Sequence, residues 1–80
     1  MMYIVIFKTN VSTEKQSLQL QTTLAKLQEI VMSSFDLDDC DRILRVVTTN
    51  PDTERICLLL EEAGFSCEAM ESFVCLEAQY

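Results

Sequence analysis

Apolar residues form two regular patterns in the first half of the chain. Residues 3–7 (Tyr-Ile-Val-Ile-Phe) are β-branched or aromatic throughout, which is typical of a strand in the centre of a sheet. Further along, apolar residues recur with the period of a helix and predict one buried face of a first helix. That face consists of Leu20, Leu24, Leu27 and Val31.

A period of two follows this helix and indicates a hairpin. In the stretch 33–37, one set of positions (Ser33, Phe35 and Leu37) alternates with a second, polar set (Ser34 and Asp36), as in a half-buried strand. The Asp-Asp-Cys-Asp stretch at 38–41 is a polar turn, and residues 42–48 form a second β-rich run. The two runs and the turn together predict a β-hairpin.

A second helix follows, and the sequence marks both of its ends. Asn50 is a favourable N-cap, and Pro51 suits the first helical position, where its missing N–H costs nothing. Gly64 follows the last periodic residue, as expected of a C-cap in the left-handed conformation. Residues 65–71 then predict a fourth strand. The buried face of the helix is predicted to consist of Ile56, Leu59, Leu60 and Ala63.

The elements follow one another in the order strand, helix, strand, strand, helix, strand. This is the split βαβ arrangement of ferredoxin-like α+β domains. It predicts a four-stranded antiparallel sheet with two helices on one face. We assign residues 1–71 to this domain and residues 72–80 to a C-terminal extension that packs on the sheet or on a partner chain.

Composition and charge narrow the functions open to the protein. The chain has 80 residues, enough for one small domain, and 49% of them are hydrophobic, which provides a core. A formal net charge of −7 repels phosphate backbones and disfavours nucleic-acid binding. No apolar stretch approaches the roughly 20 residues that span a bilayer. The start of the chain lacks the features of a signal peptide, so we expect a cytoplasmic protein.

The content of histidine, glycine and cysteine limits the chemistry. The sequence has no histidine, which removes the commonest general base and excludes a hydrolytic triad. A single glycine leaves no Gly-rich phosphate loop, and we expect no enzymatic activity. Because no C-x-x-C pair and no sign of export are present, we expect the cysteines to be reduced thiols. They are Cys40, Cys57, Cys67 and Cys75.

Residues 60–65 (Leu-Glu-Glu-Ala-Gly-Phe) and the apolar spacing after Gln16 carry a family resemblance. The spaced residues are Leu20, Leu24, Leu27 and Ile30. With the order of the elements, they resemble the heavy-metal-associated (HMA) domain family of small copper chaperones and of modules of metal-pumping ATPases. The resemblance covers residues 3–71 and implies a ferredoxin-like fold. In that family, two thiolates of a C-x-x-C loop bind Cu(I) or Zn(II).

The positions that match the two metal-binding cysteines of the family are Thr13 and Gln16. Neutral oxygen and amide groups do not replace two thiolates, so we expect a degenerate loop that binds neither metal nor cofactor. The two residues instead fit a capping box, in which each side chain bonds the backbone N–H of the other residue. An alternative metal site would combine Cys40 in the polar turn with Cys67 near the start of the last strand.

An apolar face of the sheet indicates a protein partner. By the family pattern, Ile4 and Ile6 point toward the helices, so the alternate residues of the first strand line the opposite face, which normally meets water. The end of the chain is too apolar for a free terminus. The predicted surface consists of Tyr3, Val5, Phe7, Ile43 and Val47 on the sheet and Phe73, Val74 and Leu76 in the extension. Either the extension or a second copy covers it.

These observations predict a small cytoplasmic, non-catalytic, HMA-like module that acts in protein interaction or regulation, with a protein partner or as a homodimer. The alternative is a copper- or zinc-binding or trafficking protein that uses other cysteines, such as Cys40 and Cys67.

Overall fold

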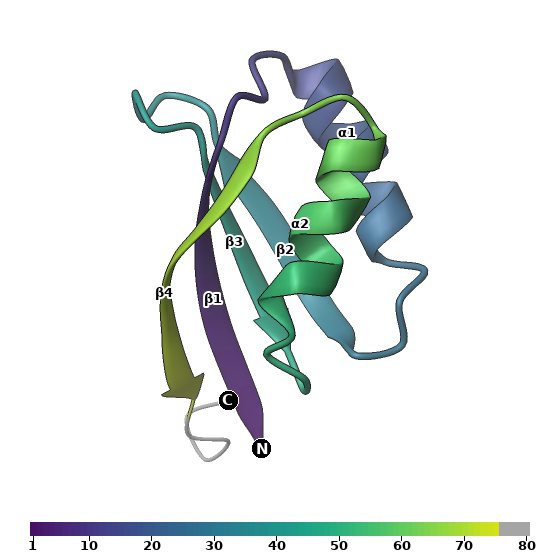
Figure 1. The fold of residues 1–80 in the computed structure, drawn as a ribbon, viewed down its shortest axis with the longest axis vertical. Helices are drawn as coiled ribbons and strands as arrows, with labels where there is room; N and C mark the ends of the chain where they lie inside the picture. The colour runs from purple at the N-terminus through teal and green to yellow at the C-terminus, as the bar shows by residue number, and fades with distance from the viewer. Residues whose placement is uncertain (76–80) are drawn as a thin grey trace.

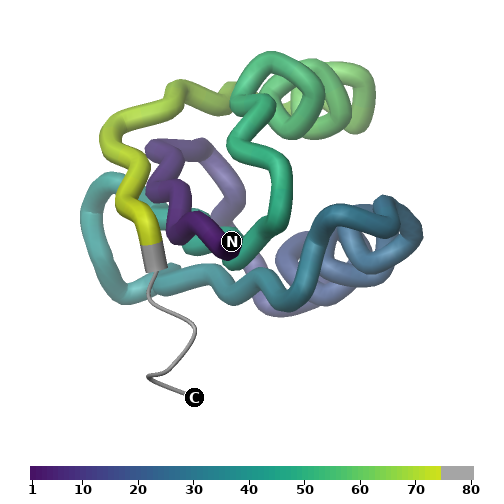
Figure 2. Tube along the Cα trace, turned by 90° about the horizontal axis from the view of Figure 1, so that it is seen from below, coloured from purple at the N-terminus to yellow at the C-terminus, as the bar shows by residue number. Residues whose placement is uncertain are grey.

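The computed structural model describes residues 1–75 as a ferredoxin-like α+β domain (Figure 1). Its elements are β1 (Met2–Thr9), α1 (Glu14–Leu24), β2 (Ile30–Asp36), β3 (Ile43–Thr48), α2 (Thr53–Glu62) and β4 (Cys67–Cys75). The strands form one antiparallel sheet in the order β2-β3-β1-β4. Both helices lie on the same side of this sheet (Figure 2). The predicted fold class is confirmed.

The core lies between the sheet and the two helices. Its members are buried almost completely, so each contributes about 1.5–3 kcal/mol through removal of apolar surface from water. They are Val5 and Phe7 of β1, Leu44 and Val46 of β3, Leu20 and Leu24 of α1, Ile56 and Leu60 of α2, and Val11 of the β1–α1 loop.

The face assigned to β1 from the family pattern is wrong. Val5 and Phe7 are 0% exposed and lie opposite Val46 and Leu44 of β3 in the core. Ile4 and Ile6 therefore occupy the open face of the sheet. A strand that is apolar on both faces has no alternation to fix its orientation. Lys8 alternates in step with Ile4 and Ile6, so it lies on the same face of the strand. It is exposed, which agrees with the observed orientation.

Helix α1 is shorter than the periodicity predicted. The N–H groups of Lys26 and Leu27 donate to the carbonyls of Thr23 and Leu24, three residues back, and this tighter turn ends the helix. Leu27 still packs against the core from the connecting turn. The predicted position of Val31 in the helix is wrong, because Val31 belongs to β2 and is exposed.

The ends of α2 are fixed by two different devices. Asp52, and not the predicted Asn50, is the N-cap: its Oδ1 accepts a hydrogen bond from the Arg55 N–H at 3.3 Å. At the other end, the prediction for Gly64 is confirmed by its φ of +96°. The Phe65 N–H donates to the Leu60 carbonyl and the Gly64 N–H to the Glu61 carbonyl, both at 3.0 Å, which is a Schellman motif.

Strand β4 extends beyond the predicted residues 65–71. It begins at Cys67 and continues to Cys75, so residues 72–75 of the predicted extension pair with β1. The register shifts between Ile6 and Phe7, which leaves Met70 as the extra residue of a β-bulge. Among residues 1–75, no helix is long and apolar enough to cross a membrane.

The conformation of Gly64 leads to a prediction about stability. Gly64→Ala should lower the free energy of unfolding by about 1–2 kcal/mol, because an L-residue is strained at positive φ. A Cβ at this position would meet no atom within 4 Å, so backbone strain alone sets the cost. Urea unfolding measures the change. Gly64→Asn is the matched control and should cost less, since Asn tolerates this conformation better. Equal midpoints for Gly and Ala would contradict the prediction.

Candidate functional site

The loop that corresponds to the family's metal loop contains a complete capping box. The Gln16 N–H donates to Thr13 Oγ1 at 3.1 Å, and the Thr13 N–H donates to Gln16 Oε1 at 3.3 Å. Gln16 Oε1 also accepts the Ser12 N–H at 3.1 Å. The predicted capping role of both residues is confirmed.

The same contacts test whether this loop fits a soft metal ion. Such ions prefer thiolate sulfur, whereas Thr13 and Gln16 offer a hydroxyl and an amide that already bond the backbone of the first helical turn. Binding a metal would require these hydrogen bonds to break and would supply only neutral oxygen in return. The residues present do not fit the metal of the family.

The three thiols whose side chains the structure describes lie in two separate places. Cys40 is exposed in the β2–β3 turn, and Cys67 is half-buried at the first position of β4. Cys67 contacts Cys57 of α2, and their Sγ atoms are 3.2 Å apart. Sequence reasoning did not single out Cys57. The available signal was its place beside the core residue Ile56, seven residues before the Gly64 turn that leads the chain back to the sheet.

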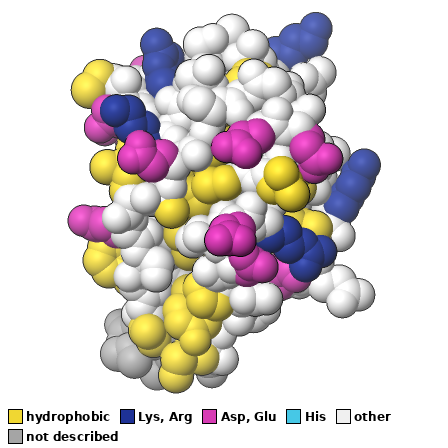
Figure 3. Space-filling model, viewed as in Figure 1, with side chains coloured by type: hydrophobic (Ala, Val, Ile, Leu, Met, Phe, Trp, Pro, Cys, Tyr) yellow, Lys and Arg dark blue, Asp and Glu magenta, His cyan; other side chains and the backbone are white. Residues whose placement is uncertain are grey.

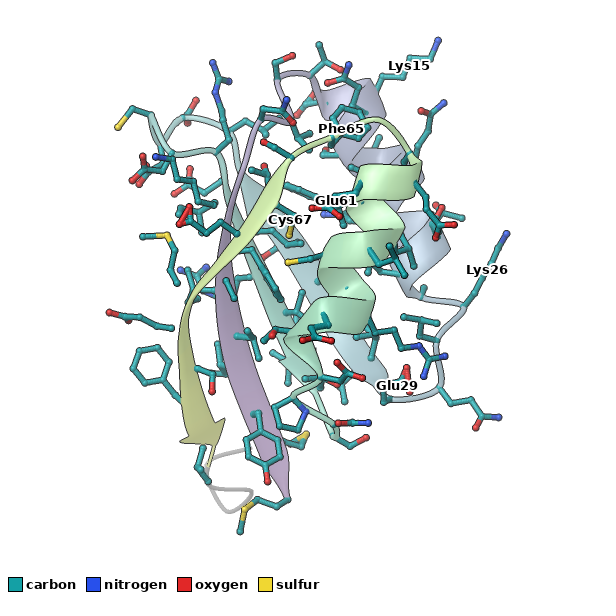
Figure 4. The ribbon with its side chains drawn as sticks, viewed as in Figure 1. Lys15, Lys26, Glu29, Glu61, Phe65 and Cys67 are labelled. Atoms are coloured by element: carbon teal, nitrogen blue, oxygen red, sulfur yellow. The ribbon has the colours of Figure 1, made fainter. Side chains whose placement is uncertain are left out.

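The surroundings of Cys67 disfavour its thiolate. Burial raises the pKa of the Cys67 thiol, and the hydrogen bond with Cys57 and the electrostatic effect of the neighbouring Cys57 and Glu61 side chains raise it further. Cys67 and Glu61 both lie in the space between α2 and β4 (Figure 4). Because the thiolate is the nucleophile and the metal ligand, this environment opposes both roles for Cys67.

The acidic β2–β3 turn brings together Asp39, Cys40 and Asp41, whose ligand atoms lie within 4.8 Å of one another. Local structure accounts for this cluster. The Asp39 carboxylate accepts the Asp41 N–H at 2.8 Å, as in an Asx-turn, and Asp41 forms an ion pair with Lys8 at 3.6 Å. An exposed cluster that is explained by turn formation does not indicate a metal site.

A half-open groove of about 570 Å³ lies between α1 and the end of β2. Its walls include Leu18, Phe35 and the carboxylates of Glu14, Asp36 and Asp38. The Ser17 hydroxyl, which also lines the groove, donates to the Glu14 carbonyl at 2.8 Å. The groove therefore contains exposed carboxylates but no activated nucleophile.

The open face of the sheet contains a continuous line of apolar side chains, one from each strand. We call it the apolar row: Met32 of β2, Val47 of β3, Ile4 of β1 and Phe73 of β4, which lie opposite one another in register. Val47 is 9% exposed, whereas Met32 and Phe73 at the two edges are 58% and 49% exposed. The row therefore has a packed centre and two large side chains open to water.

The cross-strand line beside the apolar row is more polar than the row itself. The adjacent cross-strand line contains Ser34, Arg45, Ile6 and Glu71. Hydrophobic side chains also gather at the end of the sheet where β1 begins and β4 ends, at the bottom of Figure 3, whereas acidic and basic side chains are spread over the rest of the face shown there. The apolar row lies toward this hydrophobic end.

The predicted interaction surface is partly corrected by these positions. Val5 and Phe7 belong to the core and are removed from it. Tyr3 and Val74 lie opposite each other on the helix side of the sheet, and Tyr3 packs against the core. Ile43, Val47 and Phe73 lie on the open face. Leu76 falls outside the described residues.

Neither a protein-family model nor a curated protein matches this chain. The structure shows a ferredoxin-like α+β domain, and the assignment to the HMA family stays a prediction from the residues that carry the resemblance.

The capping box leads to a prediction about helix α1. Thr13→Ala should destabilise the protein by about 1 kcal/mol, because the Gln16 N–H loses its acceptor. Thr22→Ala in the same helix is the matched control, since the Thr22 hydroxyl bonds only the Leu18 carbonyl one turn back. Chemical denaturation compares the two variants. If Thr22→Ala costs as much as Thr13→Ala, the effect does not come from the cap.

Proposed function

We propose that this protein is a non-catalytic, HMA-like interaction module of the cytoplasm whose partner is a second copy of the chain, bound through the open face of the sheet. The observation that carries the proposal is the apolar row. Phe73 and Met32 expose large side chains at its ends, and burial of each against a partner is worth about 1.5–3 kcal/mol. A contiguous apolar line of this kind is typical of an interaction surface.

The order of the strands makes this face self-complementary. Consider a two-fold axis that runs parallel to the strands and lies above the open face, over the boundary between β3 and β1. It would set β3 of one protomer against β1 of the other and β2 against β4. Met32 would then lie over Phe73 of the partner subunit, and Val47 over Ile4 of the partner subunit. In the neighbouring line, Arg45 would come within reach of Glu71 of the partner subunit. Each residue of the apolar row would thus meet another residue of the row.

Charge sets the conditions for this association. Two chains that each carry −7 repel one another, and salt screens that repulsion. Hydrophobic burial in the apolar row must exceed it. The proposed dimer should therefore tighten as salt is raised, and a regulatory change in protein concentration or ionic conditions would shift the fraction of dimer.

Metal binding through the remaining thiols is the second candidate function. It is favoured by the contact between Cys57 and Cys67, which replaces the expected combination of Cys40 with Cys67. A soft metal needs both thiols to deprotonate, and the raised pKa of Cys67 opposes that step. We therefore place this function behind self-association.

Oligomeric state tests the first candidate. Sedimentation equilibrium of the reduced protein should give a dimer with a dissociation constant on the order of micromolar. Phe73→Ser should weaken it at least about tenfold, because it removes a large side chain from the apolar row. Leu58→Ser, which changes an equally exposed apolar residue on α2, should leave it unchanged. A wild-type protein that stays monomeric at millimolar concentration would refute the homodimer.

Restoring the metal loop tests the explanation for its loss. In a background with all four cysteines replaced by Ser, Thr13→Cys with Gln16→Cys should create a site that retains Cu(I) against a competing chelator. The background protein should retain none. The matched control is Thr22→Cys with Thr23→Cys, which adds two thiols elsewhere on α1. Equal copper retention by both double variants would show that the loop has no family-like geometry.

A further inference from the structure

Two thiols from different elements meet on the helix side of the domain, away from the proposed interaction surface. Cys57 lies in α2 and Cys67 begins β4. Their Sγ atoms are 3.2 Å apart, so they need to approach by only about 1 Å to reach the roughly 2.05 Å of a disulfide bond. Both side chains are half-buried, and neither takes part in the apolar row or the capping box.

We infer that Cys57 and Cys67 form a reversible intramolecular disulfide when the protein meets a low-molecular-weight disulfide such as glutathione disulfide, and that thiol reductants reopen it. The pair is a site of oxidative modification. Cytosolic disulfides of this kind are typically transient and respond to redox conditions.

The reaction takes place in two exchange steps. The thiolate of Cys57 attacks one sulfur of the oxidant RSSR, the S–S bond of the oxidant breaks, and RS⁻ leaves with the electron pair. Cys67 then gives up its proton and attacks the Cys57 sulfur of the mixed disulfide, which releases the second RS⁻. Overall, two cysteine thiols and RSSR give one protein disulfide and two RSH, and two electrons pass to the oxidant.

The environment assigns the order of these steps. Burial and the neighbouring Glu61 raise the pKa of the Cys67 thiol, which disfavours Cys67 as the first nucleophile, so the first attack is assigned to Cys57. The adjacent position of Cys67 then makes the second step intramolecular, and a positioned group reacts far faster than one from solution.

Closure would join the two ends of the segment that connects α2 to β4. The Schellman turn at Gly64 lies between the two cysteines, and the Ser66 N–H donates to Asn10 Oδ1 at 2.8 Å. Cys67 lies opposite Thr9 of β1. A disulfide would thus join α2 to the part of β4 that is paired with the end of β1, and it would restrict the unfolded chain as well.

The test uses the double variant Cys40→Ser with Cys75→Ser, which keeps only the inferred pair. After incubation with glutathione disulfide at neutral pH, the intact mass should fall by two hydrogens. Both cysteines lie in one tryptic peptide, so digestion after Glu residues is required; it cuts between them at Glu61 and Glu62. The two fragments should stay joined until a reductant is added. The same digestion of the wild-type protein keeps the test independent of the folding of the variant.

A matched control keeps two thiols that do not meet. Cys67→Ser with Cys75→Ser retains Cys57 and the exposed Cys40. Under the same conditions it should gain glutathione masses in place of an internal bond, and loss of free thiols through closure should be at least about tenfold slower than in the inferred pair. The oxidised pair should also melt on the order of 10 °C higher than its reduced form. Glutathione adducts without closure in the Cys57/Cys67 protein, or equal closure in the control, would overturn the inference.

Discussion

The packing of both helices against one face of the two central strands is the constraint on which the rest of this domain depends. Phe7 and Leu44, which face each other across β1 and β3, are fully buried beneath the helices. Among residues 1–75, both helices lie on this face and no helix lies on the other. The central strands are nevertheless apolar on that face too, at Ile4 and Val47. The open apolar row is thus a consequence of how the core is built.

The turns at the helix ends explain how the functional features are positioned. At the start of α1, Thr13 and Gln16 hold the first turn through each other's backbone. Two cysteines at these positions would serve a metal and leave the helix without this cap, so the two roles compete for the same side chains. At the end of α2, the left-handed Gly64 reverses the chain and brings Cys67 back to Cys57 within the helix.

Features that depend on neighbouring residues could be predicted from the sequence. The capping box, the hairpin and the left-handed Gly64 each require only a few adjacent positions, and the structure confirms them. The order of the elements followed from these signals. Helix boundaries were less accurate, because the tightening of the chain after Leu24 depends on backbone bonds that leave no composition signal.

Features that depend on contacts between distant segments could not be predicted in this way. The orientation of β1 is set by its pairing with β3, and five successive apolar residues look the same from either face; only Lys8 marks the side that meets water. The contact of Cys57 with Cys67 likewise depends on the orientation of α2 relative to the sheet. Charge and polarity mark a surface in the sequence, whereas contact across a turn becomes visible only in three dimensions.

Strand β4 links the two surfaces that the protein offers. It begins at Cys67 beside α2 and carries Phe73 on the open face near its other end, and the bulge at Met70 lies between them. A bulge locally interrupts the ladder and bends the strand, so the inferred disulfide at Cys67 would act on the first part of β4 rather than on the second. Phe73 is instead held by its pairing with Ile4 of the central strand. The fold therefore places the thiol pair and the apolar row, on which the two proposals rest, toward opposite ends of β4.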